Sequence, residues 1–385
     1  MISMYNQLCP VLFGLDASKE LGKKVKEMGG TRAALIYDRG VEKTGMIRHF
    51  IRDLENHDVS VLKFNGVLPD APKTMINEAG KLASDFKCDV VIGIGGGSSL
   101  DTAKAVTILA ENSLSIEQYY PQKQKMFKQN LPLILVPTAS GTGSEVTAMA
   151  VIHDEDTDAK EFVLRPGNLA IVDPNLTLSL PDFVTAATGL DAMSHAVEAL
   201  TTNCGNPKAD LLAFYAIRLI TENLLVAYKN GQDVIARTNL SLASNFAGMA
   251  FGDASVHFGH AAAHEMGIKF HMPHGEACAL SLPEVIRFSA DMIPEKTKKI
   301  AEAMGIEVTE SMSGVDAAEL AAAKIRSLMR AVGIKSLRER GISREEVEAC
   351  AKGAVEKNWF VICALKTIDV HVMEKELLEM YDNYQ

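Results

Sequence analysis

The sequence lacks the features expected of a secreted, membrane-spanning or nucleic-acid-binding protein. Its six cysteines form no CxxC pair, so we interpret them as reduced thiols rather than as disulfides or zinc-finger ligands. No apolar run approaches the ~18–20 residues that a membrane span needs, and the segment MISMYNQLCPVLFGLD lacks the pattern of a signal peptide. A net charge of −10 argues against general binding to nucleic acids or anionic membranes. These absences predict a reducing, cytoplasmic compartment.

The composition, 47% hydrophobic and 23% charged, is that of a globular protein with a large core. In the first half of the chain, short β-rich segments alternate with helical patterns such as SKELGKKVKEMG and APKTMINEAGKLASDF. This alternation predicts a parallel α/β sheet, and the apolar runs VVIGI and LILV fit strands that are buried on both faces. The predicted strands cover residues 32–38, 59–64, 88–97 and 131–138.

Helical patterns rich in Ala, Leu and Met dominate the chain after the segment LAIVDPNLTLSLPDFV. They run from TAATGLDAMSHAVEAL through AAELAAAKIRSLMRAVG to EVEACAKGAVEKNWF. We therefore place a boundary near Leu180 and Pro181. The prediction is an α/β domain over residues 1–180 and an all-helical domain over residues 181–385.

A glycine-rich loop follows the third predicted strand, in VVIGIGGGSSLDTAKAV. Its glycines let the backbone approach a ligand closely, and the N–H groups of the following helix suit a phosphate. The loop does not match the GxGxxG fingerprint, because Ser98 occupies the sixth position. The alternative is a glycine turn without a ligand, in which Ser98 and Asp101 form a capping box for the helix.

A second loop, VPTASGTGSEVT, offers hydroxyl groups and exposed backbone after the next strand. Loops that follow two parallel strands converge on the carboxyl edge of the sheet, where α/β proteins bind ligands. Asp38 ends the strand ALIYD, and a carboxylate there accepts hydrogen bonds from a ribose diol and repels a 2′-phosphate. The alternative for Asp38 is a strand-end residue without a ligand.

Histidines are concentrated in GHAAAHEMGIKFHMPHG, which holds four of the ten in the chain. Upstream, GLDAMSHAVEAL places an Asp and a His at i, i+4, where a helix brings their Cβ atoms to about 5–6 Å on one face. A carboxylate with several imidazoles suits Fe(II) or Zn(II) rather than Ca(II) or Mg(II). The alternative is a set of structural histidines. The candidate ligands are Asp191, His195, His260, His264 and His274.

Together these motifs resemble the iron-containing (group III) alcohol dehydrogenases. GGGSSLDTAK is similar to the glycine loop of that family, and PTASGTGSEVT to its second nucleotide segment. IVDPNLTLSLP with GLDAMSHAVE resembles the first family signature, and GHAAAHEMGIKFHMPHG the second. The resemblance implies an N-terminal α/β dinucleotide-binding domain followed by an all-helical metal and catalytic domain, the dehydroquinate synthase-like fold.

The resemblance also implies roles for residues by position. The implied metal ligands are Asp191, His195, His260 and His274. The implied NAD contacts are Asp38, Gly95, Gly96, Gly97, Ser98, Thr138, Thr142 and Lys160. His264 would lie near the substrate outside the metal shell, as a proton carrier or as a structural group. Phe251 and His257 are expected to border the substrate.

The expected activity is hydride transfer between NAD(H) and a small primary alcohol or aldehyde, with Fe(II) or Zn(II) as a Lewis acid. We expect a homodimer or higher homo-oligomer without nucleic-acid or membrane partners. One alternative is a zinc glycerol dehydrogenase-like or dehydroquinate synthase-like enzyme, whose sites use one Asp and two His. Another is a metal- and nucleotide-binding sensor without turnover.

The chain departs from the family pattern at His257, at Met149 and in the C-terminal stretch CALKTIDVH. If two of the three side chains His257, Lys269 and Lys366 met near the pocket, the aldehyde would carry its own anion, such as a carboxylate, sulfonate or phosphonate. The alternative is that both lysines are solvated and His257 packs in the interior, which leaves a small neutral substrate.

Overall fold

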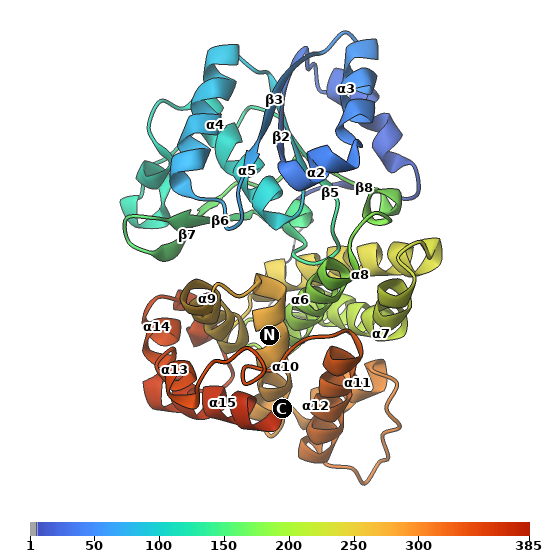
Figure 1. The fold of residues 1–385 in the computed structure, drawn as a ribbon, viewed down its shortest axis with the longest axis vertical. Helices are drawn as coiled ribbons and strands as arrows, with labels where there is room; N and C mark the ends of the chain where they lie inside the picture. Colours follow the sequence, from blue (N-terminus) through green and yellow to red (C-terminus); the bar gives the residue numbers. More distant parts are fainter. Residues whose placement is uncertain (1–4, 6) are drawn as a thin grey trace. The chain divides into compact units, whose positions relative to one another are not determined.

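The first half of the chain folds around a six-stranded parallel sheet in the order β1-β8-β5-β4-β2-β3 (Figure 1). The computed structural model describes residue 5 and residues 7–385. The strands are β1 (Val11–Phe13), β2 (Arg32–Asp38), β3 (Ser60–Val67), β4 (Val90–Gly95), β5 (Leu133–Pro137) and β8 (Leu169–Val172). The predicted parallel α/β sheet is thus confirmed.

Helices cover both faces of this sheet because its central strands are apolar on both sides. In β2, Ala34 and Ile36 pack into one core cluster, and Leu35 and Tyr37 into another on the opposite face. The first cluster includes α4 and α5, and the second includes α1 and α3. The helices are α1 (Leu21–Glu27), α2 (Arg39–Thr44), α3 (Ile47–Asn56), α4 (Lys73–Phe86) and α5 (Gly97–Glu111).

An antiparallel hairpin of β6 (Met149–Asp154) and β7 (Ala159–Leu164), not predicted from the sequence, follows the second loop. The hairpin packs against α5, and the buried Ala150 and Ile152 of β6 join the core cluster of that face. Short 3-10 helices complete the connections. They are η1 (Ala17–Glu20), η2 (Ile116–Tyr119), η3 (Pro121–Lys123), η4 (Ser144–Val146), η5 (Pro174–Thr177) and η6 (Trp359–Cys363).

The second half is helical, as predicted. One continuous core cluster of apolar side chains links its helices. The helices are α6 (Asp182–Leu200), α7 (Pro207–Lys229), α8 (Val234–Ala254), α9 (Phe258–Phe270), α10 (His274–Ser289), α11 (Pro294–Ala303), α12 (Gly314–Ala331), α13 (Arg344–Glu348), α14 (Ala351–Glu356) and α15 (Val370–Asn383).

The expectation that no apolar run approaches membrane-spanning length was wrong for helix α7. By length and composition alone it is the one helix in the described part of the chain that could cross a membrane. However, its side chains Ile217, Ile220 and Leu224 are fully buried in the helical core, against α6 and α8. This burial on one face identifies α7 as a core helix.

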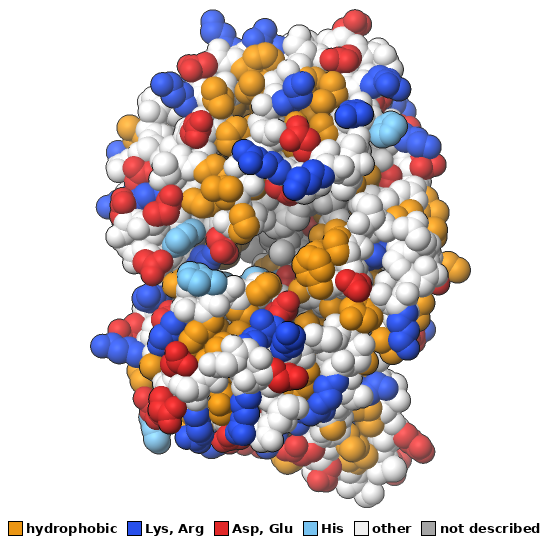
Figure 2. Space-filling model, in the orientation of Figure 1, with side chains coloured by type: hydrophobic (Ala, Val, Ile, Leu, Met, Phe, Trp, Pro, Cys, Tyr) orange, Lys and Arg blue, Asp and Glu red, His pale blue; other side chains and the backbone are white. Residues whose placement is uncertain are grey.

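The chain divides into two compact units. One comprises Gln7–Ala139 and Gly143–Ser179, and the other comprises Leu180–Gln385 together with the short segment Ser140–Thr142. Among the described residues on the face drawn in Figure 2, acidic and basic side chains are interspersed and form no continuous basic patch. This distribution agrees with the net charge of −10.

Candidate metal centre and nucleotide-binding loops

Three helices of the helical unit bring the predicted metal ligands together. Asp191 and His195 lie one turn apart on α6, and His260 lies in the first turn of α9. His274 is the first residue of α10, where Pro273 stands as the N-cap and α9 has already ended. Gly275 permits the close approach of α10 to α6, because a Cβ there would lie 2.2 Å from the Ala187 carbonyl oxygen.

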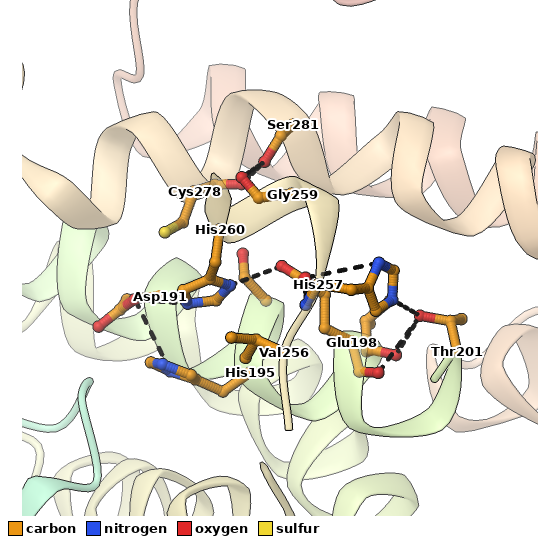
Figure 3. Close-up of polar contacts among 12 residues, drawn as sticks. Asp191, His195, Glu198, Thr201, Val256, His257, Gly259, His260, Cys278 and Ser281 are labelled. Carbon is orange, nitrogen blue, oxygen red and sulfur yellow. Dashed lines mark hydrogen bonds and ion pairs between the residues drawn. The ribbon is translucent and has the colours of Figure 1, made fainter. Parts of the chain in front are cut away.

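Asp191 is the centre of this group. Its Oδ1 lies 3.7 Å from His195 Nδ1, 4.0 Å from His260 Nε2 and 3.6 Å from His274 Nε2. Figure 3 shows the side chains of Asp191, His195 and His260 directed toward one another. The four side chains that the family resemblance implied as ligands therefore lie in one cluster.

Several polar atoms in this cluster are buried without a hydrogen-bond partner among the described residues: Asp191 Oδ1, His195 Nδ1 and His260 Nε2. Burial of such atoms is costly unless a ligand compensates. Burial lowers the pKa of His260 to about 3 and also lowers the pKa of His195, so both imidazoles are neutral and keep a lone pair. Burial raises the pKa of Asp191 to about 7, so its charged form needs a compensating positive charge nearby. The donor set therefore fits a transition-metal ion.

Glu198, a buried carboxylate behind the cluster, was not predicted from the sequence. His260 Nδ1 donates a hydrogen bond of 2.5 Å to Glu198 Oε1. Gly259 makes room for this contact, because a Cβ there would lie 2.7 Å from the same oxygen. Glu198 stands seven positions after Asp191 on the same helix face, a spacing that could have revealed it.

His257 corrects the expectation that it borders the substrate. Its side chain is fully buried, with Nε2 2.8 Å from Thr201 Oγ1 and its backbone N–H bonded to Glu198 Oε2 at 2.5 Å. It is the N-cap of α9 rather than a helical residue, so it does not share one helical face with His260 and His264. The structure thus supports the alternative in which His257 packs behind the metal ligands (Figure 3).

His264 lies beside the cluster, and its ring centroid is 5.4 Å from that of His274. Its Nδ1 donates to Asn358 Oδ1 at 2.9 Å, and Asn358 is itself oriented by donating to the Ala354 carbonyl at 3.1 Å. This contact selects the neutral tautomer whose Nε2 carries the lone pair. Sequence patterns gave no signal for Asn358, which lies 94 residues from His264.

Phe251 lies against the metal cluster, whereas Lys366 and Lys269, also expected near a substrate, have other surroundings. Phe251 on α8 stacks on the His195 ring, with centroids 4.2 Å apart and an interplanar angle of 20°. Lys366 is engaged by Asp291 at 2.6 Å, and Lys269 is exposed near the end of α9. These placements give no support to the hypothesis of a cationic pocket.

In the α/β unit, the glycine loop lies between β4 and α5, as predicted. Gly95 has a φ of +150°, a conformation that favours glycine, and Gly96 is the N-cap of α5 with no atom within 4 Å of an added Cβ. No side chain of the described residues caps α5. The proposed capping box is wrong, because Ser98 lies inside the helix and Asp101 instead accepts from Ser144 and the Val151 backbone.

The two loops and Asp38 meet at one edge of this sheet. The Thr138 N–H donates to the Gly95 carbonyl at 3.0 Å, since β4 and β5 are neighbours. Asp38 caps α2 by accepting from the Val41 N–H at 2.9 Å, and it also accepts from Ser99 Oγ at 3.2 Å. The predicted convergence on the carboxyl edge is therefore observed.

Lys160, Gly97 and Thr142 are the remaining residues that are expected to contact the nucleotide. Lys160, on β7, pairs with Asp70, whose N–H donates to Ser98 Oγ at 3.2 Å, so this cation lies near the glycine loop. Gly97 is the first residue of α5. Thr142 belongs to the segment Ser140–Thr142, which groups with the helical unit. In that segment a Cβ on Gly141 would lie 2.8 Å from Thr188.

Two family models match this chain, one over most of the α/β unit and one over most of the helical unit. Residues 10–174 match the family model of the iron-containing alcohol dehydrogenases, and residues 185–378 match the C-terminal model of the Fe-containing alcohol dehydrogenase family. The chain is 36% identical over 361 residues to 1,3-propanediol dehydrogenase of Citrobacter freundii. The alignment covers 92% of this chain and 93% of that protein.

Solved structures share the whole architecture. A 1,3-propanediol oxidoreductase superposes with a TM-score of 0.92 at 33% identity, over 99% of this chain and 100% of that one. A sulfoacetaldehyde reductase from Bifidobacterium kashiwanohense in complex with NAD+ superposes with a TM-score of 0.87 at 25% identity, over 100% of this chain and 99% of that one. The chain belongs to the iron-containing alcohol dehydrogenase family and is an oxidoreductase that acts on CH–OH groups.

Proposed function

We propose that this protein is an NAD(H)-dependent, metal-dependent alcohol dehydrogenase or aldehyde reductase of small primary alcohols and aldehydes. The observation that carries the proposal is the buried group of Asp191, His195, His260 and His274 with its unpartnered polar atoms. We assign these four residues as the ligands of one Fe(II) or Zn(II) ion. When bound, the metal supplies a Lewis acid for an alcohol or aldehyde oxygen, and NAD(H) supplies the hydride acceptor or donor.

We assign NAD(H) binding to the α/β unit, over residues 1–180. The open N-terminus of α5 at Gly96 suits the pyrophosphate, and we assign Lys160, which lies near the glycine loop, to the ribose. Asp38 suits a ribose diol and disfavours a 2′-phosphate, which favours NAD(H) over its phosphorylated form. The sulfoacetaldehyde reductase solved with NAD+ supports this assignment by similarity.

The helical unit, over residues 181–385, carries the metal and the catalytic groups in this proposal. Glu198 holds the His260 ring through Nδ1 and thereby directs Nε2 toward Asp191. We assign His264, held by Asn358, as the imidazole that accepts or delivers a proton during turnover. Phe251 supports the His195 ring by stacking.

A small neutral aldehyde is the proposed substrate class. Lys366 is paired with Asp291, and His257 is buried behind Glu198, so neither supports recognition of an anion. The similarity to a sulfoacetaldehyde reductase makes the anionic class the relevant comparison in an assay. We further propose that the protein is a homo-oligomer in a reducing cytoplasm. Size-exclusion chromatography with light scattering tests the oligomeric state.

The decisive experiment measures NADH oxidation by metal-stripped protein supplied with Fe(II) or Zn(II). The panel pairs neutral aldehydes with anionic aldehydes of equal length, and the His260→Ala variant serves as the control. We expect metal-dependent turnover that favours neutral aldehydes and is lost in the variant. Absence of metal-dependent turnover across the panel would contradict the proposed activity, and a preference for anionic members would contradict the substrate class alone.

A further inference from the structure

Cys278 stands beside the candidate metal ligands although neither spacing nor resemblance singled it out. It lies on α10, one turn after His274, and its Sγ is 3.5 Å from His274 Nε2. Donor atoms of Asp191, His260, His274 and Cys278 all lie within 4.8 Å of one another. Figure 3 draws the Cys278 sulfur on the side of His260 where Asp191 lies.

Two of the donor separations match those expected around one metal ion. Zn(II) binds sulfur at about 2.3 Å and nitrogen or oxygen at about 2.0–2.2 Å, so neighbouring donors lie roughly 3.3–3.8 Å apart. The separations of 3.5 Å for His274 to Cys278 and 3.6 Å for His274 to Asp191 lie in this range, and the 4.0 Å for His260 to Asp191 lies just beyond it. One ion at the centre of this group thus reaches the sulfur with small side-chain adjustments.

Burial supports a donor role over simple packing. Cys278 is fully buried, and Asp191 and His260, also buried, each direct an unpartnered polar atom into the same space. Cys350, an equally buried cysteine of the same unit, instead donates to the Glu346 backbone carbonyl at 3.5 Å and, among the described residues, belongs to no group of metal donors. Among the described residues, Cys278 is therefore the cysteine placed within a set of metal donors.

We propose that Cys278 supplies a thiolate to the metal ion as a further donor, in addition to the ligands Asp191, His195, His260 and His274 assigned above. The inference rests on the proposed function, because it presumes the metal. On binding, the sulfur–metal bond forms and the thiol proton leaves to the buffer, with no change of oxidation state. A thiolate is a soft donor, so this site binds Zn(II) or Co(II) in preference to harder ions. The donor set of this chain is thus a mixed oxygen, nitrogen and sulfur set.

Titration of Co(II) into the metal-stripped full chain tests the proposal by absorption spectroscopy. The wild type and the matched Cys350→Ser control are expected to show a near-ultraviolet thiolate-to-Co(II) charge-transfer band at one equivalent. Cys278→Ser and Cys278→Ala are expected to lack the band. Because loss of an outer contact already costs 10–100-fold in metal affinity, loss of this donor should lower Zn(II) affinity by at least about tenfold.

The possible failures are distinguishable. Stoichiometric Co(II) binding by the wild type without the band overturns the role of Cys278 and leaves the metal site in place. No Co(II) binding by the wild type overturns the proposed metal function, and the Cys278 inference with it. Circular dichroism checks that each Cys278 variant is folded. If neither Cys278 variant folds, a double variant in which Cys350 and the exposed Cys204 are both replaced is titrated with Co(II) instead. We expect this double variant to keep the charge-transfer band. Loss of the band in it would overturn the assignment of Cys278.

Discussion

Glu198 and His260 form a buried carboxylate–imidazole pair, with Oε1 2.5 Å from Nδ1. The other oxygen of Glu198 accepts the backbone N–H of His257 at the start of α9. Because the Nδ1 proton is held in this way, the lone pair of the His260 ring is on Nε2, the atom that faces Asp191. Glu198 therefore sets both the tautomer and the orientation of a candidate metal ligand.

Replacement of Glu198 should weaken metal binding without removing a ligand. In Glu198→Gln the side-chain shape is kept, but its amide cannot accept from both His260 and the His257 N–H. We expect a 10–100-fold loss of metal affinity, measured by competition with a chelator. Glu222→Gln, an exposed carboxylate of α7, is the matched control and should behave as wild type. Equal affinities in both variants would argue that Glu198 has no role in metal binding.

The metal contents of His260→Ala and His264→Ala should differ. We expect about one equivalent of metal per chain in the wild type, because the cluster forms one site, and a large loss in His260→Ala. His264→Ala should keep its metal while kcat falls by about 10²–10⁴-fold, the usual contribution of a positioned acid–base group. Elemental analysis with steady-state kinetics measures both. A metal-free His264→Ala protein would instead make His264 a ligand.

Asp38 should determine the preference for NADH over NADPH. Asp38→Asn removes the charge but retains a good N-cap for α2, because Asn accepts from the Val41 N–H as Asp does. We expect the ratio of kcat/KM for NADPH to that for NADH to rise by about tenfold or more, which corresponds to ~1.4 kcal/mol. Glu42→Gln, on the same helix, is the control. If the wild type already prefers NADPH, Asp38 does not face the ribose.

Glu376 should make the protein less stable as pH rises. Burial raises the pKa of this carboxyl from its ordinary value of 4.5 to about 7, with the neighbouring Glu379 as the next cause. The folded state therefore holds a proton that the unfolded state releases, so stability falls as pH rises from about 4.5 through about 7. A pKa difference of this size corresponds to an upper limit of roughly 3 kcal/mol.

Glu376→Gln should remove that dependence and raise the melting temperature at pH 8 relative to the wild type. Thermal unfolding followed by circular dichroism across this pH range measures the effect. Glu374→Gln, on the same helix and more exposed, is the control and should leave the pH profile unchanged. Parallel pH profiles for wild type and Glu376→Gln would contradict the assignment.

Local patterns were sufficient where a structure depends on neighbours along the chain. The strand over Arg32–Asp38 was predicted with the bounds that it has, because its apolar residues contact helices on both faces. The shared face of Asp191 and His195 likewise follows from helical periodicity alone. The hairpin of β6 and β7 was missed although β6 begins with the apolar run MAVI, because β7 mixes charged and apolar residues and the pairing of the two strands depends on the turn between them.

The sequence by itself determined the fold class, the glycine loops and five candidate ligands, and the family resemblance rather than spacing reduced these to four by leaving out His264. Only the tertiary structure decided what surrounds those ligands. Glu198 meets His260 across 62 residues, and Asn358 meets His264 across 94. His257 shows why spacing was insufficient: it stands at the N-cap, where helical periodicity has not begun, so its ring turns into the core instead of following the face of α9. Contacts between distant segments depend on how helices pack, and packing is decided by the whole core rather than by any local pattern.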